Sequence, residues 1–262
     1  MITFLKLGGS LITDKRKTHT ARPDVIKELA EEIFTAWEPE RGPLLIGHGS
    51  GSFGHIPAKK YGTRNGVRTE AEWAGFAEVH AEATALNRIV TDILRECGLP
   101  VLTLVPMDSI RTEDGKVKCW DTGIIGQCFG QHLIPLIFGD TVFDSVRGGT
   151  ILSTEDLFLH LCHVFREPPR ILLAGLEEGV WEDYPENTKL IRTVHACSPE
   201  RDPWLQSSEF TDVTGGMREK VHLMETLIRE EKASSAVIFT GTQRGNVLKA
   251  YQGLPVGTEI IR

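Results

Sequence analysis

The sequence lacks the features that mark secreted, disulfide-rich and membrane proteins. Its five cysteines are scattered over 262 residues, and no two of them form a Cys-x-x-Cys pair. An odd, dispersed set is typical of reduced thiols in a cytosolic protein and argues against a disulfide framework. No apolar run approaches the ~18 residues needed to propose a membrane span. Met1 leads into a strand-like run without the basic and apolar regions of a signal peptide, so we expect a soluble, cytoplasmic protein.

An excess of positive charge is also absent. Lysine and arginine number 29 against 36 acidic residues, which gives a formal net charge of -7. This balance disfavours a general nucleic-acid or anionic-membrane surface, and we expect neither partner. The phosphate-binding Walker pattern, Gly-x-x-x-x-Gly-Lys-Ser/Thr, occurs nowhere in the chain. A bound nucleotide would therefore need a different arrangement.

What is present is an alternation of short apolar runs and helical patterns. Strands are predicted at 2–7, 43–46, 101–105, 133–138, 170–174 and 236–240, a β-hairpin at 141–152 and an edge strand at 258–261. Helices are predicted from Pro23, along a stripe from Trp73 to Leu94, at 123–131, at 155–165, after Gly216 and at 246–251, while 177–203 favours hairpins and loops. Such alternation predicts an α/β fold with a mostly parallel sheet covered on both faces.

Glycines follow the first two predicted strands, at the edge of the sheet where α/β proteins bind ligands. The first strand ends in Lys6-Leu-Gly8-Gly9-Ser10, with Lys15 close behind. Bare backbone N–H groups at such a turn form an anion nest, and a lysine before it favours an anionic partner. The alternative for Lys6 is a side chain that reaches past the strand edge into solvent.

The second strand ends in a segment from Gly47 to His55 that contains Gly-x-Gly-x-x-Gly at 49–54. A dinucleotide fingerprint would need an acidic residue about 20 positions later at the end of a second strand. Glu70 and Glu72 stand there but open a predicted helix. The pattern therefore predicts a second phosphate-sized nest and disfavours a nicotinamide-dependent oxidoreductase.

Two neighbouring nests with lysines nearby suit a phosphoryl transferase, which holds a donor phosphate and an acceptor in line. Gly216 opens a helix whose N-terminus can face phosphate, and Lys220 follows it, although a surface lysine is an equal reading there. His55 follows Gly54, where its side chain can turn toward a ligand, whereas His48 reads as structural. The remaining histidines form no evident cluster with carboxylates or cysteines, so no structural metal is predicted.

Four of these segments, 6–10, 47–55, 139–140 and 212–217, together resemble the amino acid kinase superfamily. Ser52-Phe-Gly-His55 with Thr13-Asp-Lys15 is similar to the isopentenyl phosphate kinases within it. The resemblance implies a three-layer αβα sandwich, a homodimer, and Mg²⁺ and ATP as cofactors. The acceptor would be isopentenyl phosphate, converted to isopentenyl diphosphate for isoprenoid synthesis. It also implies one domain over 1–262, with an acceptor-binding lobe at about 1–165 and a nucleotide-binding lobe at about 166–262.

Site roles follow from the same resemblance, position by position. Catalytic roles fall on Lys6, Lys15, His55 and Asp156, with Asp156 orienting the lysines. ATP would be bound by Lys6, Gly8, Gly9, Ser10, Gly175, Gly179, Gly216 and Lys220, with Gly241 a further candidate on the adenosine side. The acceptor phosphate would be bound by Gly49, Ser50, Gly54 and His55. Phe76, His80 and Ala83 are added as acceptor-binding candidates from their helical spacing and not from the resemblance.

The chain departs from the family pattern at three places. Ser50 stands where glycine is usual, and 174–179 reads Ala-Gly-Leu-Glu-Glu-Gly in place of an Asp-x-Asp-Gly turn. Ser153-Thr-Glu-Asp156 replaces the usual Ser-Gly-Asp.

The absence of a carboxylate from the segment 47–55 fits a phosphate acceptor. A phosphate monoester has a second pKa of about 6, so at neutral pH it is already an anionic nucleophile and needs no base. Phe76, His80 and Ala83 lie on a helical stripe that could line an apolar tail pocket, although a stripe of this spacing is more often core. Alternatives are a kinase for another small acidic acceptor such as fosfomycin, and a catalytically weak nucleotide-binding regulatory module.

Overall fold

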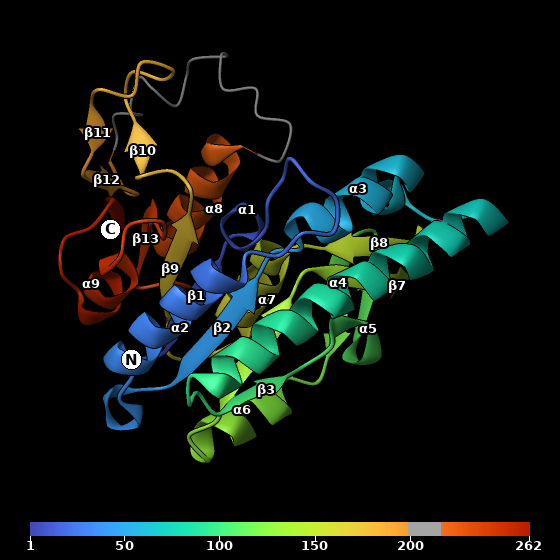
Figure 1. Ribbon diagram of the computed structural model, residues 1–262, viewed down its shortest axis with the longest axis horizontal. Coiled ribbons are helices and arrows are strands. Elements are labelled where there is room, and N and C mark those ends of the chain that lie inside the picture. Colours follow the sequence, from blue (N-terminus) through green and yellow to red (C-terminus); the bar gives the residue numbers. More distant parts are fainter. Residues whose placement is uncertain (199–215) are drawn as a thin grey trace.

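The computed structural model describes residues 1–198 and 216–262, and its centre is an eight-stranded sheet with helices on both faces (Figure 1). The strand order is β12-β14-β13-β9-β1-β2-β6-β3. In chain order these strands are β1 Thr3–Leu7, β2 Leu44–His48, β3 Val101–Thr103, β6 Ile134–Phe138, β9 Arg170–Gly175, β12 Thr193–His195, β13 Ser235–Thr240 and β14 Thr258–Ile261. The α/β class expected from the sequence is confirmed.

Pairing within this sheet is parallel except between β13 and β14. The carboxyl ends of β1, β2, β6, β9 and β13 therefore share one edge. Since β1 pairs with β2 on one side and β9 on the other, its end is the point where the strand order reverses, which is where open α/β sheets bind ligands. The prediction of an edge strand at 258–261 was wrong, because β12 from the charged segment pairs outside β14.

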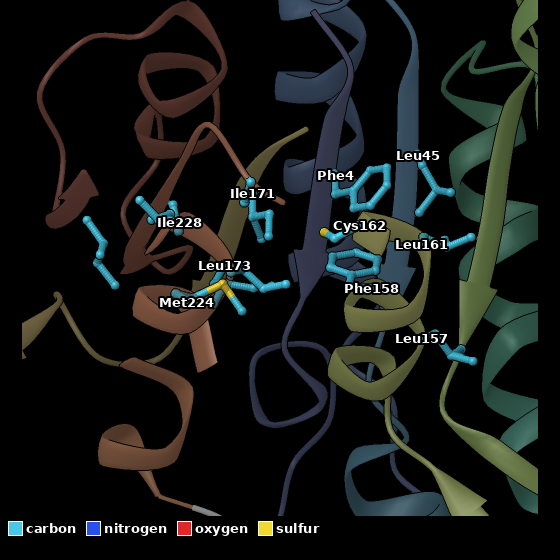
Figure 2. Packing of buried hydrophobic residues seen from close by; sticks show 14 of the residues in the cluster. Phe4, Leu45, Leu157, Phe158, Leu161, Cys162, Ile171, Leu173, Met224 and Ile228 are labelled. Atoms are coloured by element: carbon cyan, nitrogen blue, oxygen red, sulfur yellow. The ribbon is translucent and has the colours of Figure 1, made fainter. Parts of the chain in front are cut away.

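Helices cover the two faces according to the alternation of side chains along β1. Leu5 and Leu7 pack under α2 Pro23–Ala36, α4 Glu70–Glu96 and α9 Asn246–Gln252. Phe4 packs on the opposite face with α7 Thr154–Val164, beside α6 Gly123–Gly130 and α8 Met217–Arg229. Figure 2 shows this second core, where Phe4 and Phe158 lie with ring centroids 5.1 Å apart. The result is the expected three-layer sandwich.

A second sheet stands beyond the end of β6, in the order β5-β4-β7-β8. Its strands are β4 Ile110–Glu113, β5 Lys116–Trp120, β7 Asp140–Asp144 and β8 Gly148–Leu152. The Asp144 carboxylate joins its two hairpin turns by accepting N–H bonds from Asp114, Gly115, Val146 and Arg147 at 2.7–3.1 Å. Burial opposes ionisation there, but these donors hold the pKa of Asp144 far below its usual value. The β4–β5 hairpin was not predicted from the sequence.

Shorter elements complete the described chain. They are α1 Gly9–Ile12, η1 Pro39–Arg41, α3 Gly51–Tyr61, η2 Thr63–Asn65, α5 Pro106–Ser109, β10 Val180–Trp181 and β11 Leu190–Ile191. Helix α3 was also missed, because three glycines and Pro57 disfavour a helix over the segment 49–57. It starts at Gly51, whose φ of +49° suits glycine, and ends at Gly62 in the left-handed region.

Candidate active site

The two glycine turns predicted at neighbouring strand ends lie in backbone contact. A Cβ atom added to Gly9 would fall 2.4 Å from the Gly51 nitrogen. The Thr13 hydroxyl joins the turns, since it donates to the Gly9 carbonyl at 2.7 Å and accepts from the Ser52 N–H at 2.9 Å. Thr13 is buried. The two predicted anion nests are therefore one hydrogen-bonded unit at the switch point of the sheet.

Several N–H groups of this unit have no hydrogen-bond partner among the described residues. In residues 1–198 and 216–262 no hydrogen bond is made by the N–H groups of Gly9, Ser10, Ser50 or Gly51. By contrast, the Gly8 N–H donates to the Ala174 carbonyl at 2.8 Å, and the Gly49 N–H to the Leu7 carbonyl at 3.1 Å. The Gly54 N–H makes a long bond of 3.4 Å to Ser50. Among the described residues of the two turns, the N–H groups without a partner are thus those of the second and third residues of each turn, Gly9 and Ser10 in the first and Ser50 and Gly51 in the second.

Lys6 projects from β1 onto the face covered by α7 and forms an ion pair with Glu155. Both side chains are largely buried, at 13% and 16% exposure, so the pair is shielded from water. Burial opposes ionisation of Glu155, but attraction and a hydrogen bond from Lys6, with a further contribution from Lys220, leave its pKa below the usual value. Lys6, Glu155 and Lys220 are therefore neighbours, although 6 and 155 are far apart in the chain.

The neighbouring Asp156 has a different environment. Its carboxylate accepts from the N–H and hydroxyl of Ser153, both at 2.7 Å, in the capping box of α7. It also pairs with Arg64 at 3.1 Å. Asp156 was expected to orient the lysines, whereas the carboxylate that contacts Lys6 is Glu155. An alignment of the family's Ser-Gly-Asp with Ser153-Thr154-Glu155 would have identified Glu155, because the acidic residue is the third position of that pattern.

His55 lies on α3 and is exposed to solvent. Desolvation lowers the pKa of His55, and repulsion by Lys15 and Lys6 lowers it further, while Glu155 acts in the opposite direction. The lowered pKa favours the neutral ring, which can donate one N–H. The same interactions place Lys15, which is also exposed, within electrostatic reach of His55. Lys6, Lys15, His55, Glu155 and Lys220 thus form one cluster, named here the charged cluster.

His48, at the end of β2, faces the other side of the sheet and is fully buried. Its Nδ1–H donates to the Gly49 carbonyl and its Nε2 accepts from Asn87 Nδ2, each at 3.1 Å. The ring stacks on Phe138 with centroids 5.5 Å apart. Burial lowers the pKa of His48 to about 4. The structural reading of His48 from the sequence fits this environment.

The candidate tail-pocket residues on α4 divide into two kinds. Phe76 and Ala83 are buried, at 4% and 0% exposure. His80 is half-buried, and its Nδ1 lies 3.0 and 3.1 Å from the two carboxylate oxygens of the fully buried Asp140. The hydrogen bond that His80 Nδ1–H donates to the Asp140 carboxylate raises the pKa of His80 against the effect of burial. The stripe therefore includes one polar pair in an otherwise apolar surface.

The predicted adenosine-side glycines also differ from one another. A Cβ on Gly175 would meet nothing within 4 Å, so this glycine borders open space. A Cβ on Gly179 would lie 2.6 Å from Thr258 Oγ1, so close packing against Thr258 explains the glycine at this position. Gly216 is the N-cap of α8, the helix that carries Lys220. The rest of the predicted motif, 212–215, lies outside the described residues.

Two further searches bear on the class of site. In the described part of the chain, no three histidine, cysteine, aspartate or glutamate side chains are grouped so as to hold a metal ion. Among the described helices, none combines the length and apolarity needed to cross a bilayer.

Comparison with known proteins supports the fold. The model of the Amino acid kinase family matches residues 1–240. Isopentenyl phosphate kinase of Methanocaldococcus jannaschii is 31% identical, with 99% of this chain and 98% of the relative covered. The enzyme of that name from Methanothermobacter thermautotrophicus is 31% identical, with 98% of each chain covered. A solved isopentenyl phosphate kinase structure superposes with a TM-score of 0.80 at 27% identity, covering 99% of this chain and all of the other. The chain belongs to the amino acid kinase family.

Proposed function

We propose that this protein is an ATP-dependent kinase that phosphorylates the phosphate group of isopentenyl phosphate. The observation that carries the proposal is the unit of two glycine turns, joined by Thr13 and bordered by the charged cluster. Two adjoining sets of free N–H groups with three lysines provide for two phosphate groups side by side. The relatives named isopentenyl phosphate kinase, which match over nearly their full length, supply the identity of the acceptor.

The transfer needs no general base. An oxygen of the acceptor phosphate forms a bond to the γ-phosphorus of ATP, and the bond from that phosphorus to the β–γ bridging oxygen breaks to release ADP. Because the acceptor's second pKa is about 6, it attacks as a dianion at neutral pH. The protein's contribution is to hold the two phosphates in line and to offset the charge that builds up between them.

Donor and acceptor phosphates occupy opposite sides of the unit in this proposal. Gly8, Gly9 and Ser10 border the donor, with Gly216 and Lys220 on α8 on the same side. Ser50 and Gly51 offer N–H groups to the acceptor, since the Gly49 N–H is already engaged. His55 donates to the acceptor oxygens from a neutral ring. Lys6 and Lys15 bridge the transferring group.

Glu155 fixes Lys6 at the floor of this site. A buried ammonium needs a partner, and the ion pair holds Lys6 Nζ at the end of β1 until phosphate arrives. Asp156 acts on Lys6 indirectly, because it caps α7, the helix from which Glu155 projects.

The donor set of the described residues does not suit a magnesium site built from protein alone. Glu155 is committed to Lys6, and no cluster of metal-binding side chains occurs in residues 1–198 and 216–262. Mg²⁺ would therefore be held mainly by the ATP phosphates, where it neutralises charge on the transferring group.

Other parts of the proposal follow from family membership. Residues 1–165 would form the acceptor-binding lobe and residues 166–262 the nucleotide-binding lobe, with Gly175 at the open end of β9 on the adenosine side. The isopentenyl tail would extend toward Phe76 and Ala83 on α4. The protein would act as a cytoplasmic homodimer in isoprenoid precursor synthesis.

The proposal is tested by measuring ADP release from Mg-ATP with isopentenyl phosphate, dimethylallyl phosphate, fosfomycin, UMP and N-acetylglutamate. Isopentenyl phosphate is expected to give the highest kcat/KM. Turnover with another acceptor but not with isopentenyl phosphate would refute the substrate. The His80–Asp140 pair is the reason to include a polar phosphonate, because a hydroxyl or epoxide oxygen could bond to the free ring nitrogen. Tight ATP binding without turnover of any acceptor would indicate a regulatory module.

A further inference from the structure

The segment that carries Lys15, named here the basic loop (Asp14–Thr20), is closed on itself at its base. Asp14 N–H donates to the Thr20 carbonyl at 2.9 Å, and Thr13 bridges to Ala21. The Asp14 carboxylate binds the backbone and guanidinium of Arg16 at 3.0–3.2 Å. These contacts shape the loop internally, but none of them attaches it to the acceptor side of the site.

His19, near the C-terminal end of the loop, makes that attachment. Its ring packs against Phe53 of α3, with centroids 4.2 Å apart and an interplanar angle of 41°. Its Nδ1 pairs with Glu82 of α4. The following residue adds to the contact, since Thr20 N–H donates to Ser52 Oγ at 3.3 Å. Ser52 and Phe53 belong to the segment that ends in His55, so His19 attaches the basic loop to α3.

The backbone at His19 has a φ of +49°, in the left-handed region. A residue with a side chain occupies this region at a conformational cost, and it persists where surrounding contacts determine it. At His19 this backbone conformation directs the ring to its contacts with Phe53 and Glu82. Lys15, at the other end of the same loop, is exposed, yet it lies close enough to His55 to affect its pKa.

We propose that His19 is a positioning residue, which holds Lys15 over the acceptor phosphate by docking the basic loop on Phe53 and Glu82. This inference rests on the proposed function, in which Lys15 and His55 contact the same phosphoryl groups. His19 itself touches neither substrate. A long, exposed lysine gains a defined position only if its loop is fixed, and the His19 side chain supplies a fixed point on α3.

The test uses His19→Asn, because asparagine tolerates the left-handed backbone but lacks the ring. A matched control is His132→Asn, at another left-handed histidine (φ +55°), which lies after α6 and away from the basic loop. His19→Asn is expected to lower kcat/KM for isopentenyl phosphate by about 10- to 100-fold, the cost of misplacing a reacting group, with the Kd for ATP unchanged. His132→Asn is expected to leave both unchanged. An undiminished kcat/KM in His19→Asn would overturn the proposal.

A double-mutant cycle distinguishes positioning from a general structural role. If His19 acts through Lys15, His19→Asn causes no further loss in a Lys15→Ala background. The same loss in both backgrounds would overturn the proposal.

A spectroscopic measurement keeps this inference separate from the proposed function. The pKa of the His55 ring, followed by NMR without substrates, is expected to rise in both His19→Asn and Lys15→Ala, because a displaced Lys15 no longer repels the imidazolium. An unchanged His55 pKa in His19→Asn, with a shift in Lys15→Ala, would overturn the positioning of Lys15. Both expected shifts in a protein that does not phosphorylate isopentenyl phosphate would sustain the positioning and refute the substrate.

Discussion

His48 and His55 bracket the same glycine-rich segment, but they have opposite environments. His48 points from β2 toward α4, is fully buried and uses both ring nitrogens within the protein. His55 lies on α3 at the edge of the charged cluster and is exposed. The pKa of both rings is lowered, that of His48 by burial in the core and that of His55 by desolvation and by repulsion from Lys15 and Lys6. The comparison shows that a lowered histidine pKa alone does not mark a ligand-binding residue, because it also occurs in a ring whose two nitrogens are both used within the protein.

The largest expected effect concerns His55. His55→Ala is expected to lower kcat/KM for isopentenyl phosphate by about 100-fold or more, as for loss of a hydrogen-bond donor to a reacting oxygen. The Kd for ATP, measured by calorimetry, should change little. His55→Gln, which keeps an N–H donor, is the matched variant and should retain more activity. Loss of ATP binding in His55→Ala would place this side chain on the donor side and contradict its assignment.

The neighbouring carboxylates of α7 extend the same comparison. Glu155→Gln is expected to lower kcat by about 10- to 100-fold, because Lys6 loses the partner that fixes it beside the reacting phosphate. Asp156→Asn weakens a helix cap and should cost about 1 kcal/mol of unfolding free energy, with little change in kcat. Steady-state kinetics and urea unfolding of both variants check this. The reverse pattern would restore Asp156 as the residue that orients the lysines.

The protonation of His48 should lower the unfolding free energy of the protein at acidic pH. Its folded pKa of about 4 lies below the usual value of 6.5, so the unfolded chain binds the proton first as the pH falls. His48 should therefore lower the unfolding free energy by about 2 kcal/mol between pH 8 and pH 5. Urea unfolding of the wild type and of His48→Gln at both pH values measures the difference. An equal pH dependence in both proteins would show that His48 is not the group responsible.

The smallest expected effect concerns His80, whose pKa is raised by Asp140. A raised folded pKa gives stability that is full below pH 6.5 and is lost as the pH rises through the folded value. In Asp140→Asn the His80 pKa, followed by NMR, should fall, and this component of the stability should disappear. A His80 pKa that stays high in the variant would point to another anion, of which Asp108 is the candidate in reach.

Much of the sheet could be predicted from local patterns, because β1, β2, β6, β9 and β13 are short apolar runs next to glycines or helical stripes. The segments missed were those that local patterns conceal. Helix α3 contains glycines and Pro57, and its start depends on contact with Thr13 from another turn. The place of β14 within the sheet depended on β12, a three-residue strand in a polar segment.

The candidate site could be proposed in outline from the sequence, whereas the contacts of its residues required the fold. Lys6, the two glycine turns and His55 stand out because each is unusual for its position in the sequence. Glu155 does not, since a glutamate in the first turn of a helix is ordinary; only the approach of α7 to β1 reveals its partner. Likewise, nothing in the sequence near Gly49 shows that its N–H is used by Leu7.

The hydroxyl of Thr13 has a consequence for how such an enzyme can change. In the proposed function, the Thr13 hydroxyl would hold the two phosphate sites at a set separation, because it bonds to both turns. Substitutions along α4 would then change which acceptor fits without changing the spacing across which the phosphoryl group moves.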